Sequence, residues 1–378
     1  MNSIGPTLFS PIANTFQAPY PLSDECVLER GSSDNIQDEP AQGAQLTLFS
    51  SRTNPRDHLS QFFKLRPLDL FWWFVGERQA IWRKRFLERQ SPPWTLDPIL
   101  RTYRFTNVYR ELDPGTKFAI ENILERPFPA KDRIFNVMLY RLIGRSDTFV
   151  HIGFQKLSDF RQHDFESKLK NIRDVQKRPP FTGAYMVAPY LKMGSRDKIE
   201  NIARLLARLI TRFDHLYDRI NSSSTAKEVY FHLRGEYGFG KFLAYQVLVD
   251  LLYPLRTNGY RPLLPFSHDD WAEAGPGAHK GILILLKSGL KLSDLEVMRW
   301  LRLNQRQEFK RLGLNFTYLA SKNGKEIEIS LANIQNCLCE YHKYAKIRNG
   351  TGRARRKFAL RSDSPEQLRL DRRLEIAL

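Results

Sequence analysis

The stretch Gly238-Phe239-Gly240-Lys241-Phe242-Leu243-Ala244 decides the fold class, because it joins two segments with helical patterns. An amphipathic segment, 229–234, precedes it, and an apolar segment, 243–253, follows it. Glycine tolerates the backbone angles of a tight turn and lets two chains approach closely. The pattern therefore predicts two helices joined by a short turn, with unpaired amides at the start of the second. An ordinary interhelical turn with no further role is the alternative interpretation.

Apolar residues recur at helical spacing along much of the remaining chain. Serine or threonine followed three residues later by glutamate marks further helix starts. These capping boxes are expected at Thr225 with Glu228 and at Ser293 with Glu296, and helices are expected at 71–88, 95–113 with Thr95 as the N-cap, 134–143, 199–220 and 332–348.

A small β-hairpin is expected near the C-terminus. Asn323-Gly324 is a pair preferred in type I′ turns, so residues 316–319 and 326–331 are expected to be its strands. The predicted fold class is therefore mainly α, with one small β-hairpin.

Charge narrows the class of partner. The chain has 378 residues, with 59 Lys and Arg against 41 Asp and Glu, so its formal net charge is +18. Residues 1–60 contain seven acidic and three basic residues, a net charge of −4, which leaves +22 on the rest. A positive field of this size concentrates polyanions, so nucleic acid is the first partner to expect. The alternative is that basicity only maintains solubility, and no apolar run predicts a membrane span.

Cysteine content indicates the cellular environment. Only Cys26, Cys337 and Cys339 occur, which favours a reducing, intracellular location: cytoplasm or nucleoid in bacteria or phage, nucleus in eukaryotes. The last two lack further ligands at zinc-binding spacing, so they are expected to be buried core thiols.

The chain is expected to divide into a disordered acidic leader at 1–62, a helical domain at 63–358 and a tail at 359–378. A split of the helical domain into two lobes near 190–225 is left open. Within the leader, Gln45, Leu46, Leu48 and Phe49 resemble the Q-L-x-L-F peptide by which bacterial replication proteins dock on the sliding clamp. The alternative is an apolar patch without function.

The glycine turn resembles the helix-hairpin-helix motif of DNA repair proteins, through the pattern G-h-G-x-x-x-A of Gly238, Gly240 and Ala244. In that motif, amides at the start of the second helix face a DNA phosphate, and Lys241 adds positive charge at this point. The resemblance implies a helical domain like that of helix-hairpin-helix DNA glycosylases, with Gly238, Gly240 and Lys241 as DNA-binding residues.

Two acidic residues, Asp269 and Asp270, follow the turn by about thirty residues. Glycosylases of the helix-hairpin-helix fold carry a catalytic Asp at a comparable distance, so either residue is expected near a flipped nucleotide. Gly275 and Gly277, with Lys280 nearby, are expected to cradle a phosphate. Their spacing is not that of a Walker loop.

Residues 103–113, Tyr-Arg-Phe-Thr-Asn-Val-Tyr-Arg-Glu-Leu-Asp, leave no wide polar face on a helical wheel. Some polar side chains here must be partly buried, and a buried charge needs a partner. One interpretation is an internal network of arginine and carboxylate groups. The other is that Arg104, Asn107 and Arg110 hold nucleotide phosphates or read a base edge.

Basic residues cluster again at the C-terminal end. Arg353, Arg355 and Arg356 form either a phosphate-contacting arm or a solvated tail. In the preceding helix, Glu340 and Lys343 are three residues apart, which is the spacing of a surface ion pair.

Together these segments resemble the phage 5-hydroxymethyluracil DNA kinases, a family first described as α-glutamyl/putrescinyl thymine pyrophosphorylases. The resemblance covers about residues 66–358, and the run 104–113 is its most specific part. It implies an enzyme that extrudes 5-hydroxymethyluracil from duplex DNA and phosphorylates its hydroxymethyl oxygen from ATP with Mg²⁺. The residues that carry it are Arg78, Arg85, Pro93-Trp94-Thr95, 103–113, Gly238-Phe239-Gly240, Ala244-Tyr245-Gln246, Asp250-Leu251, Gly275-Pro276-Gly277-Ala278, Gly281 and 338–344.

The same resemblance implies roles for individual residues, because phosphoryl transfer needs a proton acceptor, cations on the phosphates and metal ligands. Catalytic roles are expected for Asp269, Asp270, Asp250 and Glu340, with Asp250 and Asp270 as metal ligands. Nucleotide or phosphate binding is expected at Arg104, Asn107, Arg110, Lys280, Lys343, Gly275 and Gly277.

Two other functions remain open. A DNA glycosylase would need no ATP and would leave an abasic site. Phe242 stands where a lyase-type glycosylase carries its lysine, and Lys241 is one residue early, which counts against the lyase form; a monofunctional form could use Asp269 or Asp270 alone. A noncatalytic DNA-binding module would keep the glycines and the basic surface but would not need the carboxylates.

Overall fold

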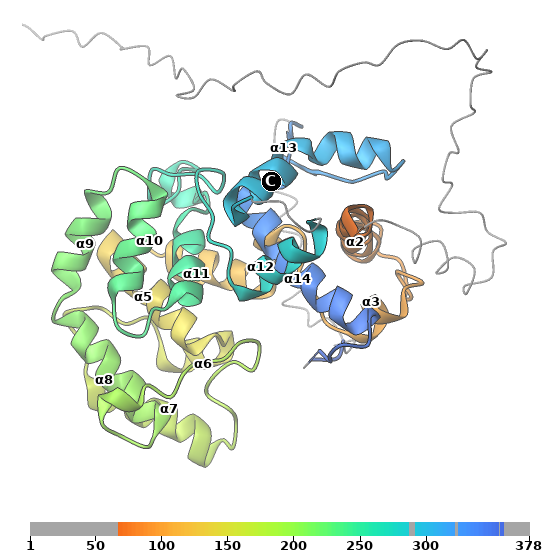
Figure 1. Ribbon diagram of the computed structural model, residues 1–378. Helices are drawn as coiled ribbons and strands as arrows, with labels where there is room; N and C mark the ends of the chain where they lie inside the picture. Colours follow the sequence, from red (N-terminus) through yellow and green to blue (C-terminus); the bar gives the residue numbers. More distant parts are fainter. Residues whose placement is uncertain (1–66, 287–291, 322–323, 355, 359–378) are drawn as a thin grey trace, which may run out of the picture. The chain divides into compact units, whose positions relative to one another are not determined.

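The computed structural model describes residues 67–286, 292–321, 324–354 and 356–358 (Figure 1). Within it, the first and last long helices pack against each other. Helix α2 (Pro67–Trp82) contacts α14 (Leu331–Arg348), and a π-helical turn, Arg83–Leu87, continues it. Almost every face of α2 is buried, as expected for a helix with so many aromatic side chains. The prediction of a helix at 71–88 is confirmed.

The segment predicted as one helix from Thr95 to Asp113 is different, and that prediction is wrong. Only α3 (Pro98–Thr102) is α-helical, and its N-cap is Asp97, whose Oδ1 accepts from the amide of Leu100 (2.7 Å). The chain is then extended until the 3-10 turn Arg110–Leu112. Side chains of α14 and the backbone of the C-terminal arm form hydrogen bonds with this backbone, so it does not need a helical ladder.

The segment predicted as one helix at 199–220 is also interrupted. The structure has α8 (Lys198–Ile210) and α9 (Phe213–Asn221), separated at Thr211 and Arg212. The amide of Arg212 donates to the carbonyl of Leu209 (3.1 Å), a 3-10 bond that breaks the α-helical register. Apolar spacing continued through the break and therefore suggested a single helix.

The glycine turn lies between α10 (Ala226–Gly235) and α11 (Lys241–Leu251), which pack against each other. Gly238 has a positive φ of 96°, and a Cβ there would collide with Leu205, so the turn requires glycine at this position. Gly240 is the N-cap of α11. Two helices joined by a short turn are confirmed, whereas helix-hairpin-helix character stays a prediction.

The hairpin is shorter than expected. Strands β1 (Leu319–Ala320) and β2 (Glu326–Ile327) pair antiparallel, with Leu319 opposite Ile327. Gly324 has a positive φ of 76°, in keeping with the predicted turn. The other predicted starts and ends agree: Ser293 forms a full capping box with Glu296, and α14 stops just before Gly350. Thr225 caps α10 as predicted, but the Glu228 side chain accepts from the amide of Ser224, so that capping box is only half formed.

The remaining helices lie between these elements, and most of them pack on sequence neighbours. No helix in the described part of the chain is long and apolar enough to cross a membrane. The division near 190–225 stays a prediction, and residues 1–62 and 359–378, with the clamp-like peptide, lie outside the described residues. The remaining bounds are α4 (Pro114–Ala119), α5 (Ala130–Ile143), α6 (Ser146–Ile152), α7 (Gln162–Lys170), α12 (Pro276–Leu285) and α13 (Asp294–Arg311), with 3-10 or π turns at Ile120–Leu124, Asn171–Val175, Leu191–Met193 and Arg256–Asn258.

Candidate active site

The run 103–113 lies along one face of α14 and is held there by side chains of that helix. Asn336 Nδ2 donates to the carbonyl of Asn107 (3.2 Å), and Glu340 Oε2 accepts from the amide of Thr106 (3.0 Å). These side chains lie at intervals of three and four residues, which places them on one helix face. The full set on that face is Asn333, Asn336, Cys337, Glu340 and Lys343, each in hydrogen-bond contact with the run 103–113.

Arg78 of α2 also binds the backbone of this loop. Its Nη2 donates to the carbonyl oxygens of Phe105 (3.3 Å) and Thr106 (3.0 Å). Burial lowers the pKa of Arg78, and the charges of Glu340 and Asp113 oppose that shift. A buried guanidinium group that binds carbonyl oxygens is a rigid anchor. Arg78 therefore orders the loop together with α14.

Two carboxylates, Asp113 and Glu340, face this anchor. Asp113 Oδ1 accepts from the amide of Asn107 (2.9 Å), and Glu340 Oε2 also pairs with Lys343 Nζ (2.5 Å). Burial raises the pKa of Asp113 to about 6; Glu340 adds to this rise, while the Asn107 amide and two arginines oppose it. Asp113 is therefore a carboxylate suited to accept a proton near neutral pH.

Arg110 forms a second polar centre at the start of the 3-10 turn that Asp113 caps. Its amide donates to Asn333 Oδ1 (3.0 Å), and its Nη2 donates to Gln246 Oε1 (2.5 Å). The side chain is 6% exposed, and its Nη1 has no hydrogen-bond partner among the described residues. An unsatisfied buried donor is uncommon in native structures, so this nitrogen is a candidate partner for a ligand or an ordered water.

Tyr245 adds a second open group beside Arg110. Its hydroxyl is buried and lacks a hydrogen-bond partner in the described part of the chain. Burial raises the pKa of Tyr245, and the charge of Arg110 opposes that shift, so the two groups share one neighbourhood. Together they offer a charged donor and a hydroxyl group to an incoming anion or base edge.

The glycines of the predicted phosphate cradle are explained by helix packing. Gly275 is the N-cap of α12, which packs on α14. A Cβ on Gly277 would collide with Sγ of Cys339, and a Cβ on Gly281 with the carbonyl oxygen of Leu338. Close approach of the two helices therefore requires glycine here, and phosphate binding by Gly275 and Gly277 stays a prediction.

Three of the four predicted catalytic carboxylates lie in structural contacts away from the loop 103–113. Asp250 is fully buried, and both its oxygens accept from Arg141. Asp269 pairs with Arg302 (3.0 Å) and accepts from the amide of Leu331 (2.7 Å), at the start of α14. Both oxygens of Asp270 accept from Ser267, which closes a turn. Only Glu340 lies in the cluster with Arg78 and Asp113; the catalytic roles of the other three stay predictions.

The predicted phosphate-binding and DNA-binding cations Arg104, Arg353 and Lys241 do not all lie together. The amide of Arg104 donates to the carbonyl of Arg356 (3.1 Å), so the loop and the C-terminal arm lie side by side. Arg353 is exposed on the same arm, and Arg355 lies outside the described residues. Lys241 is exposed beside the glycine turn, with Glu273 at 3.8 Å.

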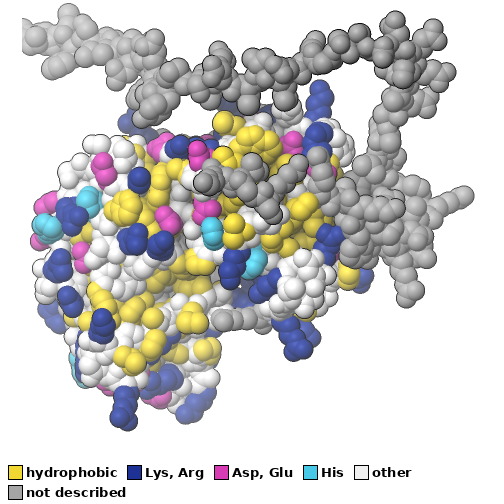
Figure 2. All heavy atoms as spheres, viewed as in Figure 1, with side chains coloured by type: hydrophobic (Ala, Val, Ile, Leu, Met, Phe, Trp, Pro, Cys, Tyr) yellow, Lys and Arg dark blue, Asp and Glu magenta, His cyan; other side chains and the backbone are white. Residues whose placement is uncertain are grey.

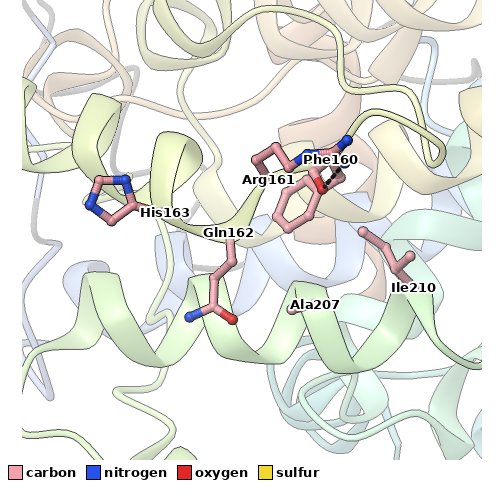
Figure 3. Close-up of a pocket in the computed structure, with 6 residues that line it drawn as sticks. All are labelled: Phe160, Arg161, Gln162, His163, Ala207 and Ile210. Atoms are coloured by element: carbon pink, nitrogen blue, oxygen red, sulfur yellow. Dashed lines mark hydrogen bonds between the residues drawn. The ribbon is translucent and has the colours of Figure 1, made fainter.

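Charged side chains lie over many elements, with hydrophobic ones exposed between them (Figure 2). A separate hollow of about 330 Å³ is lined by Phe160, Arg161, Gln162, His163, Ala207 and Ile210 (Figure 3). It contains none of the predicted site residues.

The sequence did not single out Asp113, Asn333, Asn336, Gln246 or Tyr245 as site residues. The signal for them was indirect, because polar side chains within an apolar stretch of 103–113 need buried partners elsewhere in the chain. Arg110 is buried as expected, but its side chain donates to the side-chain oxygen Oε1 of Gln246 and not to a carboxylate. Arg104 is exposed.

The fold and the site define a mainly helical domain that orders an arginine-bearing loop over one long helix. Comparison with protein families matches residues 66–353 to the family described as 5-hmdU DNA kinase, helical domain. The chain therefore belongs to this family, which confirms the resemblance seen in the sequence.

One relative is a 5-hmdU DNA kinase from Bacillus phage SP10. It is 30% identical over 288 residues, which are 73% of this chain and 44% of the relative. The chain thus spans less than half the length of the curated relative that it matches. No solved structure matches the chain significantly.

Proposed function

We propose that this chain is a DNA-base kinase, which transfers the γ-phosphoryl group of ATP to the hydroxymethyl oxygen of 5-hydroxymethyluracil in DNA. The observation that carries the proposal is the family match over 66–353, a range that contains the loop 103–113 and all of α14. The net charge of +18 supports a polyanionic substrate.

Asp113 is the proton acceptor in this proposal, in place of the aspartates expected from the sequence. Its pKa of about 6 leaves it ionised at neutral pH while keeping it basic enough to accept a proton. The O–H bond of the hydroxymethyl group breaks as its oxygen bonds to the γ-phosphorus. The bond from that phosphorus to the β,γ-bridging oxygen breaks, ADP leaves, and the proton resides on Asp113.

Arg110 is the phosphate-holding group of the same proposal. Its open Nη1 is a charged donor in a buried site, where electrostatic interactions are stronger than in water. Gln246 and Asn333 fix its orientation. Glu340 and Lys343 are positioning residues, because they hold the backbone of 104–106.

The residues predicted to bind Mg²⁺ do not fit a metal cage. The oxygens of Asp250 and Asp270 already accept hydrogen bonds from Arg141 and Ser267. Across the described ranges, no three His, Cys, Asp or Glu side chains are grouped to hold a metal ion. The proposed transfer step therefore assigns no role to a metal ion held by these residues. Kinases commonly receive Mg²⁺ together with the phosphates of the nucleotide.

The test incubates the 378-residue chain with duplex DNA containing 5-hydroxymethyluracil, Mg²⁺ and γ-labelled ATP, followed by digestion to nucleosides. Label on the modified nucleoside supports the kinase. Free base identifies a glycosylase, and unchanged DNA leaves a binding module; both outcomes contradict the proposal.

Two isosteric variants separate the structural assignment from the sequence-based one. Asp113→Asn is expected to lose transfer while Asp270→Asn retains it, because Asp270 only closes a turn with Ser267. The reverse result would move the proton acceptor to the 269–270 turn.

A further inference from the structure

A hollow of about 250 Å³ lies between α12 and the C-terminal half of α14. Leu283, Ile284 and Ala345 give it an apolar part, and Lys280, His342 and Lys346 give it a basic part. Figure 2 shows His and Lys or Arg side chains beside hydrophobic ones over α12 and α14. The proposed transfer step uses none of these residues.

Positive charge in this hollow is not balanced by acids. Within the described ranges no ion pair involves Lys280 or Lys346, and no Asp or Glu lines the hollow. Lys170, by contrast, contacts both Glu166 and Glu200. Like charges that share a concave, partly apolar site repel one another until an anion neutralises them.

The charges of Lys280 and Lys346 both act on His342, so the two lysines lie near the same point in the hollow. Burial lowers its pKa, and the charges of Lys346 and then Lys280 lower it further. The two lysines come from different helices, α12 and α14, so the tertiary fold brings them together. The cluster is therefore a feature of the folded structure.

The turn after α14 binds the backbone of Lys346 and packs against its side-chain stem. The amide and the hydroxyl of Thr351 both donate to the Lys346 carbonyl (2.9 and 3.2 Å). A Cβ on Gly352 would lie 3.1 Å from Cδ of Lys346, so the turn packs along the lysine stem. An ordered lysine loses less conformational entropy when it binds a ligand.

We propose that this hollow is a binding site for a phosphate group of a nucleotide, with Lys280 and Lys346 as its charge partners and His342 as a hydrogen-bonding group. Lysine ammonium groups bind phosphate as compact point charges, and the apolar part suits a sugar or base. The inference deepens the proposed function by assigning a phosphate site on the α12 side of α14. Its ligand is the phosphate of ATP or of the DNA backbone, which share this chemistry.

The test measures binding without turnover, in the full chain. Wild type and the double variant Lys280→Met, Lys346→Met are titrated with ATP and, separately, with a short unmodified duplex DNA. Methionine keeps the length of each stem and removes its charge. Lys227→Met, on the exposed surface of α10, is the matched control, and thermal unfolding monitored by circular dichroism checks that each variant folds.

Loss of two charged contacts is expected to weaken binding of one ligand by about tenfold or more, while the control binds like wild type. Weaker ATP binding alone identifies the nucleotide as the source of the phosphate, and weaker DNA binding alone identifies the DNA backbone. Unchanged affinity for both ligands in a folded double variant would overturn the proposal. If the double variant binds either ligand more weakly than wild type, but the wild-type chain transfers no label to DNA, the phosphate site is supported and the proposed kinase activity is rejected.

Discussion

The backbone amide of Thr106 donates a hydrogen bond of 3.0 Å to Oε2 of Glu340, 234 residues further along the chain. The same carboxylate pairs with Lys343, which donates to the carbonyl of Arg104. The most specific motif of the sequence is thus bound at its backbone, which leaves its arginine and aspartate side chains for other contacts. Helix α14 positions this loop, and its residues are part of the site for that reason.

Glu340→Ala is expected to destabilise the protein by about 1–3 kcal/mol, because it leaves the amide of Thr106 without its acceptor and Lys343 without its partner. Glu340→Gln keeps an acceptor oxygen and is expected to lose less. Urea unfolding of both variants measures the difference. Equal losses would mean that the charge, and not the hydrogen bond to Thr106, holds the loop.

The buried pair of Arg141 and Asp250 gives a second prediction. Asp250 is fully buried and bound at both oxygens, so Asp250→Ala leaves an unpaired buried arginine and is expected to cost about 3–5 kcal/mol of unfolding free energy. The double variant Arg141→Met, Asp250→Leu is expected to recover part of that loss. A metal ligand at this position would instead show altered Mg²⁺ dependence with little change in stability.

Gly281 tests the packing of α12 on α14. A Cβ at this position would collide with the backbone carbonyl of Leu338, so Gly281→Ala is expected to cost about 1–3 kcal/mol. Gly235→Ala, at the end of α10, meets no atom within 4 Å and is the matched control. The control is expected to match or slightly exceed wild-type stability in chemical unfolding. Similar losses at both sites would contradict the close helix contact.

Local signals predicted most of the helices correctly, because capping residues and apolar spacing act within a few residues. The full capping box of Ser293 with Glu296 and the end of α14 before Gly350 are examples. The family resemblance also came from short motifs, and the family match confirms it. The helix predicted at 95–113 was wrong because hydrogen bonds from Asn336 and Glu340, far away in sequence, replace the helical ladder.

The site was harder to predict for the same reason. Arg110 was recognised within its motif, but its partners Gln246 and Asn333 lie 136 and 223 residues away. Spacing cannot reveal such contacts. The glycines of 275–281 were interpreted as a phosphate cradle, whereas the structure gives Gly277 and Gly281 a packing role that depends on Cys339 and Leu338.

Asp113 gives a prediction that depends on pH. Burial raises its pKa from 3.8 to about 6, so the folded state binds its proton more tightly than the unfolded state does. The stabilisation linked to this proton is complete below pH 3.8 and is lost as the pH rises through about 6. Relative to Asp113→Asn, which cannot titrate, wild type is therefore expected to lose stability across this interval and to level off above it.

Urea unfolding of both proteins at several pH values between 4 and 8 measures this difference. A difference that is flat would show that folding leaves the pKa of Asp113 unchanged, and one that rises with pH would show that folding lowers this pKa; either result would remove Asp113 as the proton acceptor. If it is the acceptor, phosphoryl transfer rises with pH through the same value of about 6, because only the carboxylate accepts the hydroxymethyl proton. Agreement between the midpoints of stability and rate would therefore link both effects to one carboxyl group.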